Sequence, residues 1–405
     1  MKIFRYTLQL QRKDTDILSK AQKNKVILSI VAISFTQGLQ YCISPVLRQI
    51  GEYYFDVSVV LVQMLVTAPA LIAMLVALIS GWLVVKVSVK KLLLFGSFVA
   101  GAAGLVPFLA DSFGLLFASR ILYGVGLGLA TALNLSVVVE FFTGDERVRA
   151  MGIQAASIGA GMVASTTVGG ILGQNGFQNA YFTHIIAFVS TIVIAVCLPD
   201  TGKVKMEKTE KIRINGSVIK YSIFGLLEFL FLITFTTNIA MHLSGNLLGN
   251  TTVSGLLTGI FSGAQIVIGL ILGYVTKLAK KYTLPVSMLC FSVGAIILML
   301  FSENSVMLAI GAVFCGFSQG IFVPQAMVEV SNSVSSASAT MASAVFTGGA
   351  CMGQLISPVI LNTISKLIFG EIDTTNVYMI SAVGMTIAAA IFAVMIKKQN
   401  LEEKV

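Results

Sequence analysis

The chain is 405 residues long, and hydrophobic residues make up 56% of it against 11% for charged residues, with a mean hydropathy of +0.90. The surface of a soluble domain usually carries about 25–35% charged residues, which this composition cannot supply. Lipid must therefore cover most of the surface, and these proportions exclude an ordinary soluble domain.

Twelve apolar stretches follow one another along the chain, each long enough to cross a hydrocarbon core of about 30 Å as a helix. The turns between them, such as Ala110 to Phe113, leave no room for a soluble domain. We therefore expect an all-α polytopic membrane protein with about twelve transmembrane helices. The predicted spans cover residues 26–47, 57–80, 91–110, 113–139, 151–173, 181–198, 219–241, 253–276, 284–302, 305–328, 339–361 and 375–396.

The 27 Lys and Arg residues give the chain a net charge of +9, but they are unevenly distributed. If the N-terminus is cytoplasmic, only Arg48 and Lys366 fall on the outer side and Arg120 falls within a span, while all the others lie in cytoplasmic segments. The positive-inside rule then predicts a multi-pass protein of the cell membrane with both termini in the cytoplasm. This distribution explains the basic charge without a nucleic-acid partner.

A basic tail, residues 1–25, precedes the first span and lacks the apolar core and cleavage site of a signal peptide. We expect it to stay on the protein. A disordered tail and an amphipathic helix that lies on anionic lipid are both compatible with its composition.

A polar stretch from Pro199 to Ile214 separates two sets of six spans. We expect a six-helix bundle over 26–198, a cytoplasmic linker over 199–218, a second bundle over 219–397 and a cytoplasmic tail over 398–405. A shift of 192 residues places four glycines of the first half on glycines of the second, which favours two related halves. The pairs are Gly81 and Gly273, Gly124 and Gly316, Gly128 and Gly320, and Gly161 and Gly353.

The junction of spans 2 and 3 has a characteristic spacing of small, apolar and basic residues, namely Gly81, Leu83, Lys86, Lys90 and Lys91. It resembles the loop motif of the major facilitator superfamily of secondary transporters, Gly-x-Leu-x-Asp-Arg/Lys-x-Gly-Arg/Lys-Arg/Lys. Val85 replaces the Asp of the motif and Ser88 replaces its second Gly. The resemblance implies that Gly81 and the three lysines belong to a cytoplasmic gate.

Span 4 continues the resemblance, because Arg120, Gly124 and Gly126 are similar to the Arg-x-x-x-Gly-x-Gly pattern that the family associates with proton coupling. In span 5 a run from Gly161 to Gly170 resembles the Gly-x-x-x-Gly-Pro-x-x-Gly-Gly motif of exporters, with Ser and Thr in place of the central Gly and Pro. The resemblance covers nearly the whole chain. It implies a secondary transporter that moves a small molecule, works as a monomer and needs no cofactor.

Glu228 lies about 14 Å into span 7, too deep for its carboxyl group to reach water easily. On a regular helix Phe224, Phe231 and Phe235 lie within about 60° of it. Apolar surroundings favour the neutral carboxyl group. We therefore expect Glu228 to exchange a proton for a cationic substrate or to pair with that substrate, and a protonated or paired structural Glu is the alternative.

Arg120 is the only basic residue deep within a predicted span, and it cannot lose its proton. It needs a carboxylate, backbone carbonyl groups or water as partners. The resemblance implies a role in substrate or proton release, and a structural clamp between helices is the alternative. In this family spans 1, 4, 7 and 10 line the central cavity. The candidate residues of the substrate or proton pathway are Gln37, Tyr41, Arg120, Asn134, Glu228, Phe231, Phe235, Gln265, Gln319 and Gln354.

Glu140 and Glu329 lie at the cytoplasmic ends of spans 4 and 10, where the negative end of a helix dipole disfavours a carboxylate. We expect Lys86, Arg147 or Arg149 to pair with Glu140 in a gate that breaks as the two halves move. Solvated helix ends without such a gate are the alternative.

The sequence contains no nucleotide-binding loop, metal-ligand cluster or nucleophile with a nearby base, so we expect neither an enzyme nor a metal site. The leading prediction is a proton-coupled exporter of a small amphiphilic or lipophilic compound that works by alternating access. Uptake of a polar metabolite such as a sugar or an organic anion remains open. A membrane sensor or scaffold that transports nothing is the alternative from another class.

Overall fold

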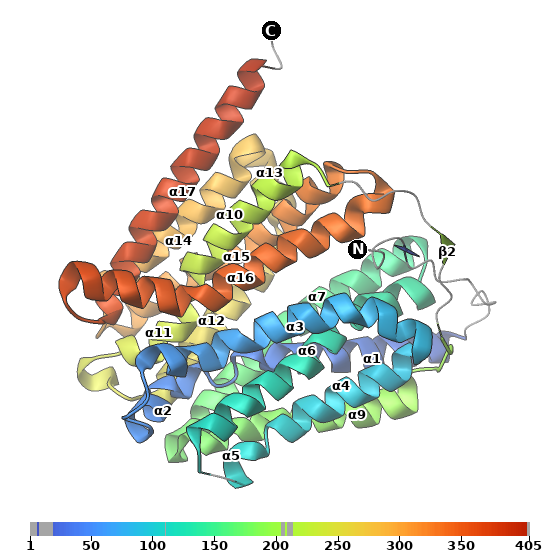
Figure 1. Ribbon diagram of the computed structural model, residues 1–405, viewed down its shortest axis with the longest axis horizontal. Helices are drawn as coiled ribbons and strands as arrows, with labels where there is room; N and C mark the ends of the chain where they lie inside the picture. Colours follow the sequence, from blue (N-terminus) through green and yellow to red (C-terminus); the bar gives the residue numbers. More distant parts are fainter. Residues whose placement is uncertain (1–5, 8–18, 110, 204–206, 209–213, 403–405) are drawn as a thin grey trace. The chain divides into compact units, whose positions relative to one another are not determined.

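The computed structural model describes residues 6–7, 19–109, 111–203, 207–208 and 214–402. Most of the predicted N-terminal tail, part of the linker and the last residues of the predicted C-terminal tail lie outside this description. Twelve helices in the described chain are long and apolar enough to cross a membrane. The predicted all-α polytopic fold is therefore confirmed (Figure 1).

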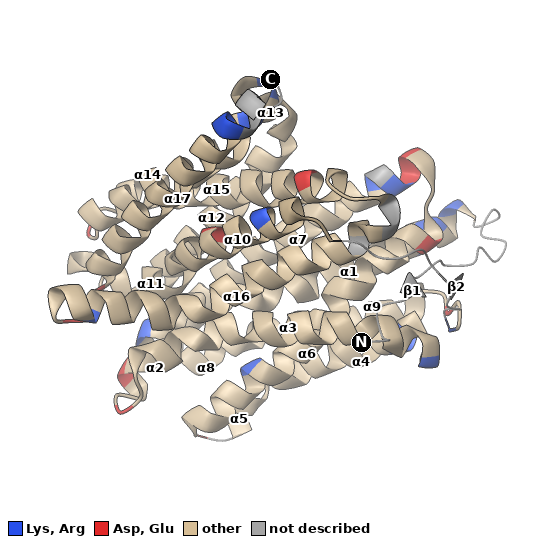
Figure 2. Cartoon of the chain, turned by 45° about the horizontal axis from the view of Figure 1, so that its top comes forward, with Lys and Arg blue, Asp and Glu red and all other residues tan. Residues whose placement is uncertain are grey.

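Charged residues gather mainly near the ends of the helices, and long helix middles are free of them (Figure 2). This distribution is expected for spans, because a charge at the bilayer centre costs about 2.5 kcal/mol or more. The exceptions within the helices are the residues that need a functional explanation.

The chain divides into two compact units. The first contains the chain up to Ile43 and the segment Leu65–Ile212, and the second contains Ser44–Met64 and the chain from Arg213 onward. The helix α3 (Val59–Lys86) therefore begins in the second unit and continues in the first. The hydroxyl group of Ser44 donates a hydrogen bond to the carbonyl oxygen of Thr236 within the second unit.

The first unit contains most of α3, five other long helices and several short elements. Val26, Ile30 and Ile33 of α1 pack with apolar residues of α4 and α6 in its core. Its other elements are β1 (Tyr6–Thr7), which pairs antiparallel with β2 (Glu207–Lys208), α1 (Lys20–Gly38), η2 (Leu39–Tyr41), α4 (Val89–Ala103), α5 (Val106–Leu109), α6 (Phe113–Phe141), α7 (Gly144–Leu172), η4 (Gly173–Asn175), α8 (Phe177–Ala180), η5 (Tyr181–His184) and α9 (Ile185–Cys197).

The second unit contains the start of α3 and the remaining helices. Phe261, Phe291, Phe322 and Phe346 are fully or almost fully buried in its core. Its other elements are η3 (Ser44–Val46), α2 (Leu47–Tyr53), α10 (Gly216–Leu232), α11 (Thr234–His242), η6 (Gly245–Leu247), α12 (Thr251–Leu270), α13 (Leu272–Ala279), η7 (Lys280–Tyr282), α14 (Thr283–Leu300), α15 (Ser305–Asn332), α16 (Ser336–Phe369) and α17 (Thr374–Glu402).

The two units repeat the same internal packing. In the first, α1 packs against α7, α6 and α9, and α4 packs against α6 and α9. In the second, α10 packs against α16, α15 and α17, and α14 packs against α15 and α17. A shift of 192 residues relates these helices pairwise, so the two related halves that the glycines predict share one arrangement of helices.

Three of the four matched glycine pairs mark close contacts in both units, whereas Gly273 meets open space. A Cβ atom on Gly124 of α6 would lie 2.8 Å from the Cβ of Ile72 on α3, and one on Gly316 of α15 would lie 2.8 Å from the Cβ of Ala264 on α12. Glycine at such positions lets helix backbones approach closely, which is how membrane helices commonly associate.

Several helix boundaries differ from the sequence prediction, and two of the differences have a clear local cause. The helix α1 begins at Lys20, six residues before the predicted span, because Ser19 and Gln22 form a capping box. The predicted span 253–276 is broken at Ile271, where α12 ends and α13 begins. Gly269 and Gly273 flank this break, and glycine is less favourable than alanine within a helix by about 1 kcal/mol.

Candidate functional site

Glu228 lies on α10 inside the second unit and is fully buried. The Oγ of Ser318 on α15 donates a hydrogen bond of 2.6 Å to its Oε1. The Oε2 atom has no hydrogen-bond partner among the described residues. Cys290 of α14 and Cys315 of α15 lie within electrostatic range of the carboxyl group.

No cation neutralises this carboxyl group in the described part of the chain, where the ion pairs involve other residues. A buried carboxylate with one hydrogen bond and no counter-ion is costly, and protonation removes that cost. The site can therefore hold a proton, and it links α10 to α15 through one hydroxyl group.

The phenylalanines near Glu228 in the sequence point toward other helices. Phe224 and Phe231 contact α17, and Phe235 contacts α12, whereas Glu228 contacts α15. Phe235 also lies beyond the interruption between α10 and α11, so the regular helical spacing does not apply to it. The contacts are Phe224 with Phe392, whose ring centroids lie 3.9 Å apart, Phe231 with Gly384, and Phe235 with Phe261, at 4.7 Å.

Arg120 lies on α6 in the first unit and is fully buried. Its Nε donates a hydrogen bond of 2.9 Å to the carbonyl oxygen of Leu65, and its Nη2 donates one of 2.8 Å to that of Gln40. The guanidinium carbon lies 4.8 Å from the centre of the Tyr123 ring. Nη1 has no partner among the described residues. Backbone carbonyl groups, rather than a carboxylate, thus hold this cation.

The Leu65 carbonyl is available to Arg120 for a local reason. In a regular α-helix the N–H of residue 69 would donate to it, but residue 69 is a proline inside α3 and has no N–H. Gln40 lies in η2, where the α-helical bonding of the first span has ended. Arg120 therefore donates to two carbonyl groups at places where the regular α-helical hydrogen bonding is interrupted.

The other candidates in the first unit lie where α1 meets α6. Gln37 donates from Nε2 to the carbonyl oxygen of Ala130 at 3.3 Å, and Asn134 donates from Nδ2 to Ser34 Oγ at 2.9 Å. Tyr41 is buried in η2. Gln37 and Asn134 thus connect spans 1 and 4 within the unit, as Glu228 and Ser318 connect spans 7 and 10.

Three glutamines of the second unit are distributed over α12, α15 and α16. Gln354 is buried, whereas Gln265 and Gln319 are half-buried. Gln265 Nε2 and Gln319 Oε1 have no hydrogen-bond partner among the described residues. Two polar groups without partners on neighbouring helices are suited to a polar ligand.

The basic residues of the predicted gate make contacts other than an ion pair with Glu140. The Nζ of Lys86 lies 3.7 Å from the centre of the Trp82 ring. Lys90 donates to the carbonyl oxygen of Ala195 at 2.8 Å, and so caps α9. Arg147 donates to the carbonyl oxygens of Phe142 and Val139 at the end of α6, Gly81 is half-buried, and Lys91 and Arg149 are exposed.

The two acidic gate candidates are both half-buried. Glu140 forms a hydrogen bond with Thr201 and lies near Asp200. Glu329 accepts hydrogen bonds from Tyr221 OH at 3.4 Å and from Gln325 Nε2 at 2.9 Å. The hydrogen bonds of both carboxyl groups therefore come from neutral groups in this conformation.

A network of three buried amides escaped the sequence reasoning. Gln63 of α3 donates to Asn238 Oδ1 at 2.8 Å, and Asn362 of α16 donates to Gln63 Oε1 at 2.6 Å. All three side chains are at most 2% exposed. They attach the start of α3 to α11 and α16 within the second unit. The signal that could have revealed them is the occurrence of an amide in an otherwise apolar span.

The two histidines, His184 and His242, have partners within their own units. His184 contacts the carbonyl oxygen of Ala100 at 2.8 Å and Cys42 Sγ at 3.5 Å. His242 contacts Thr374 Oγ1 and the carbonyl oxygen of Leu298, both at 2.8 Å. Both histidines therefore act as internal clamps of their own units.

The helix arrangement, the repeated halves and the buried polar groups define a polytopic membrane transport protein. A sequence model of the Major Facilitator Superfamily matches residues 27–241 and 221–404. The chain belongs to this superfamily, and it is a transporter of that type.

Individual relatives are distant. The riboflavin transporter RibZ of Clostridioides difficile is 25% identical over 42% of this chain, and a probable vesicular acetylcholine transporter-B of Danio rerio is 30% identical over 34% of it. These matches span only 38% and 27% of the relatives' own lengths. The uncharacterised transporter YtbD of Bacillus subtilis is 24% identical over 95% of this chain and 100% of its own.

Solved structures share the fold. A crystal structure of a peptide transporter named POT has a TM-score of 0.77 at 10% identity, covering 92% of this chain and 94% of that one. An identity this low reflects the common arrangement of helices and carries no information about substrate.

Proposed function

We propose that this transporter works by alternating access in the cell membrane, with both termini in the cytoplasm, and exports a small amphiphilic or lipophilic compound in exchange for protons. The observation that carries the proposal is the hydrogen bond between Ser318 and Glu228, a fully buried carboxyl group without a counter-ion in the described chain.

Charge and packing are coupled at this position. The neutral carboxyl group fits the interior of the unit, whereas a carboxylate at the centre of a span costs about 2.5 kcal/mol or more unless it gains water or a cation. Release of the proton therefore favours a rearrangement of α10 against α15 that gives Glu228 a polar partner. A cationic substrate is one such partner, which makes binding of the substrate and the proton mutually exclusive.

The helix α3 connects the two units and contains a position where it can bend. It begins in the second unit and continues in the first, and Pro69 lies four residues after the point of transition. A proline inside a helix removes a backbone hydrogen bond and is a common position of bending. We infer that α3 bends here as the units move, while Arg120 donates to the Leu65 carbonyl that Pro69 leaves without its helical donor.

The proposal has a direct test in sealed vesicles that contain the purified transporter and an imposed pH gradient. Lipophilic cations should accumulate in response to the gradient with the native protein. Glu228→Gln should abolish this response but retain slow exchange that ignores the gradient. The matched control is Glu371→Gln, which removes an exposed carboxyl group of the loop before α17. Unchanged gradient-driven transport by Glu228→Gln would refute the role of Glu228.

Uptake of a polar or anionic metabolite is the second candidate, favoured by Arg120 Nη1, a buried donor without a partner in the described chain. A thermal-shift screen with lipophilic cations, sugars and organic anions separates the candidates, because a ligand stabilises the state that binds it. Stabilisation by organic anions alone, lost in Arg120→Gln, would favour uptake. Binding without any movement of ligand in vesicles would instead indicate a sensor.

A further inference from the structure

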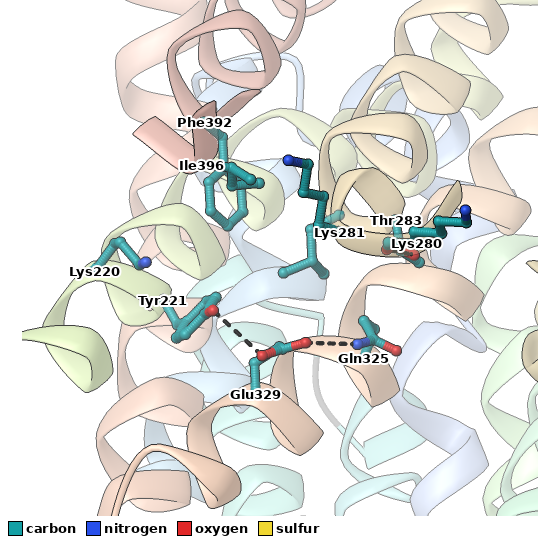
Figure 3. Close-up of a pocket in the computed structure, with 10 residues that line it drawn as sticks. Lys220, Tyr221, Lys280, Lys281, Thr283, Gln325, Glu329, Phe392 and Ile396 are labelled. Carbon is teal, nitrogen blue, oxygen red and sulfur yellow. Dashed lines mark hydrogen bonds between the residues drawn. The ribbon is translucent and has the colours of Figure 1, made fainter. Parts of the chain in front are cut away.

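A cavity of about 170 Å³ opens at the end of the second unit where α10 begins and α17 ends. Its walls come from α10, η7, α14, α15 and α17, and Figure 3 shows the residues around it. Thr283, Leu284 and Phe392 are buried parts of its wall. The cavity is large enough for a group the size of a phosphate ester.

Positive charge dominates this cavity. Lys220, Lys280 and Lys281 line it together with a single carboxylate, Glu329. Tyr221 donates to one oxygen of that carboxylate and Gln325 to the other, so each oxygen has one neutral donor and can still accept a second. In Figure 3 the ammonium groups of Lys280 and Lys281 point away from the carboxylate. They remain available to an anion, since neither forms an ion pair with a described residue.

The backbone around Lys280 is unusual. Its φ is 50°, and it is the only non-glycine residue with positive φ in the described chain. Such a conformation is strained and persists where the surroundings hold it. Here the Oγ1 of Thr283 donates to the Lys280 carbonyl oxygen at 2.6 Å. The strained turn places two consecutive lysines at the mouth of the cavity.

The lipid-facing side of α17 carries an apolar stripe, whereas Phe392 and Ile396, which line the cavity, lie on the opposite side of the helix. Ile387, Ile391 and Val394 are 55%, 52% and 66% exposed, and their spacing places them on one face of the helix. Ile396 continues α17 into the cavity wall. A basic site at the end of spans whose outer faces are apolar is suited to a phospholipid, with the phosphate in the cavity and the acyl chains against the apolar outer surface of the spans.

We propose that this cavity binds a phosphate-bearing anion, and that its occupant is the headgroup of an anionic phospholipid. The lysines bind the phosphate. Glu329 accepts a hydrogen bond from a hydroxyl or ammonium group of the headgroup, which selects headgroups that carry such a donor. Phosphatidylglycerol, with a net negative charge and two hydroxyl groups, fits best. Phosphatidylethanolamine follows, and phosphatidylcholine, which lacks a donor, fits least.

The test uses the full chain, purified in detergent and titrated separately with these three phospholipids while its thermal stability is measured. Phosphatidylglycerol should bind most tightly. Each lysine beside an anionic headgroup contributes about a fivefold change in affinity, so Lys280→Gln combined with Lys281→Gln should weaken phosphatidylglycerol binding by about 25-fold. Lys277→Gln is the matched control, because Lys277 lies on the preceding α13 and outside the cavity.

The same titration is repeated with two water-soluble anions, inorganic phosphate and glycerol phosphate. Lysine-dependent binding of these anions, with no extra gain from phosphatidylglycerol, would overturn the lipid as occupant. Equal stabilisation by all three lipids, or equal effects of the double variant and Lys277→Gln, would overturn the site itself. Phosphatidic acid, which lacks the glycerol of the headgroup, is titrated as a fourth lipid. Glu329→Gln should narrow the difference in affinity between phosphatidylglycerol and phosphatidic acid, and retention of the full difference would contradict the selecting role of Glu329.

Discussion

Arg120 donates a hydrogen bond from Nε to the carbonyl oxygen of Leu65, the acceptor that Pro69 leaves without its helical donor. One buried cation thus completes the backbone of a neighbouring helix at the point where that helix passes from one unit to the other. The arrangement makes the guanidinium group part of the helix architecture, whatever its role in transport.

A double-mutant cycle measures this relationship. Arg120→Met removes the donor and should lower the free energy of unfolding by about 1–3 kcal/mol, because carbonyl groups at Leu65 and Gln40 lose their partner. Pro69→Ala supplies an N–H to the Leu65 carbonyl. The cost of Arg120→Met should therefore fall by about 1 kcal/mol in the Pro69→Ala background, measured by denaturant unfolding in detergent. Strictly additive effects of the two changes would show that the shared carbonyl is unimportant.

The bond between Ser318 and Glu228 should contribute to stability as well as to coupling. Ser318→Ala removes the one described hydrogen bond of the carboxyl group, and we expect the free energy of unfolding to fall by about 0.6 kcal/mol and by no more than about 1.7 kcal/mol, the mean and the maximum measured for hydrogen bonds between membrane helices. Ser287→Ala is the control, because that hydroxyl group donates only within α14. Equal thermal unfolding of the two variants would contradict a specific contribution.

The repeated glycines predict equal sensitivity in the two units. Gly316→Ala would bring a Cβ atom into contact with the Phe261 carbonyl oxygen, so it should destabilise the protein by about 1–3 kcal/mol. Gly124→Ala should have an effect of similar size. Gly269→Ala meets open space on α12 and should be neutral or slightly stabilising. The measurement is the thermal unfolding midpoint of each of the three variants. Indistinguishable midpoints would contradict the close-contact explanation.

The buried amides should hold the segment Ser44–Met64 in the second unit. Gln63→Leu deprives Asn238 of a donor and Asn362 of an acceptor, so the free energy of unfolding should fall by about 1–3 kcal/mol. Hydrogen exchange should therefore accelerate in peptides that cover this segment, while α14 provides an internal reference. Unchanged exchange in the segment would mean that other contacts hold it.

Local patterns were sufficient for the architecture and for two of the buried ionisable residues. Hydropathy and charge distribution predict twelve spans, because a helix must be apolar over about 20 residues to cross the bilayer. The glycine repeat predicts the two halves. Glu228 and Arg120 stand out because ionisable side chains are rare in spans, a property that each residue carries in its own sequence neighbourhood.

The partners of those residues were decided only by the tertiary structure. Glu228 contacts Ser318, Arg120 contacts the carbonyl of Leu65, and Gln63 joins α3 to two helices of the second unit. Each of these contacts joins residues that are at least 55 positions apart in the sequence. A helix pattern shows which face is apolar, but it does not show which helix covers that face or where a proline has left a carbonyl without a donor. Such contacts arise when helices pack, so the sequence by itself determined the elements of this transporter, and packing decided how its buried charges are held.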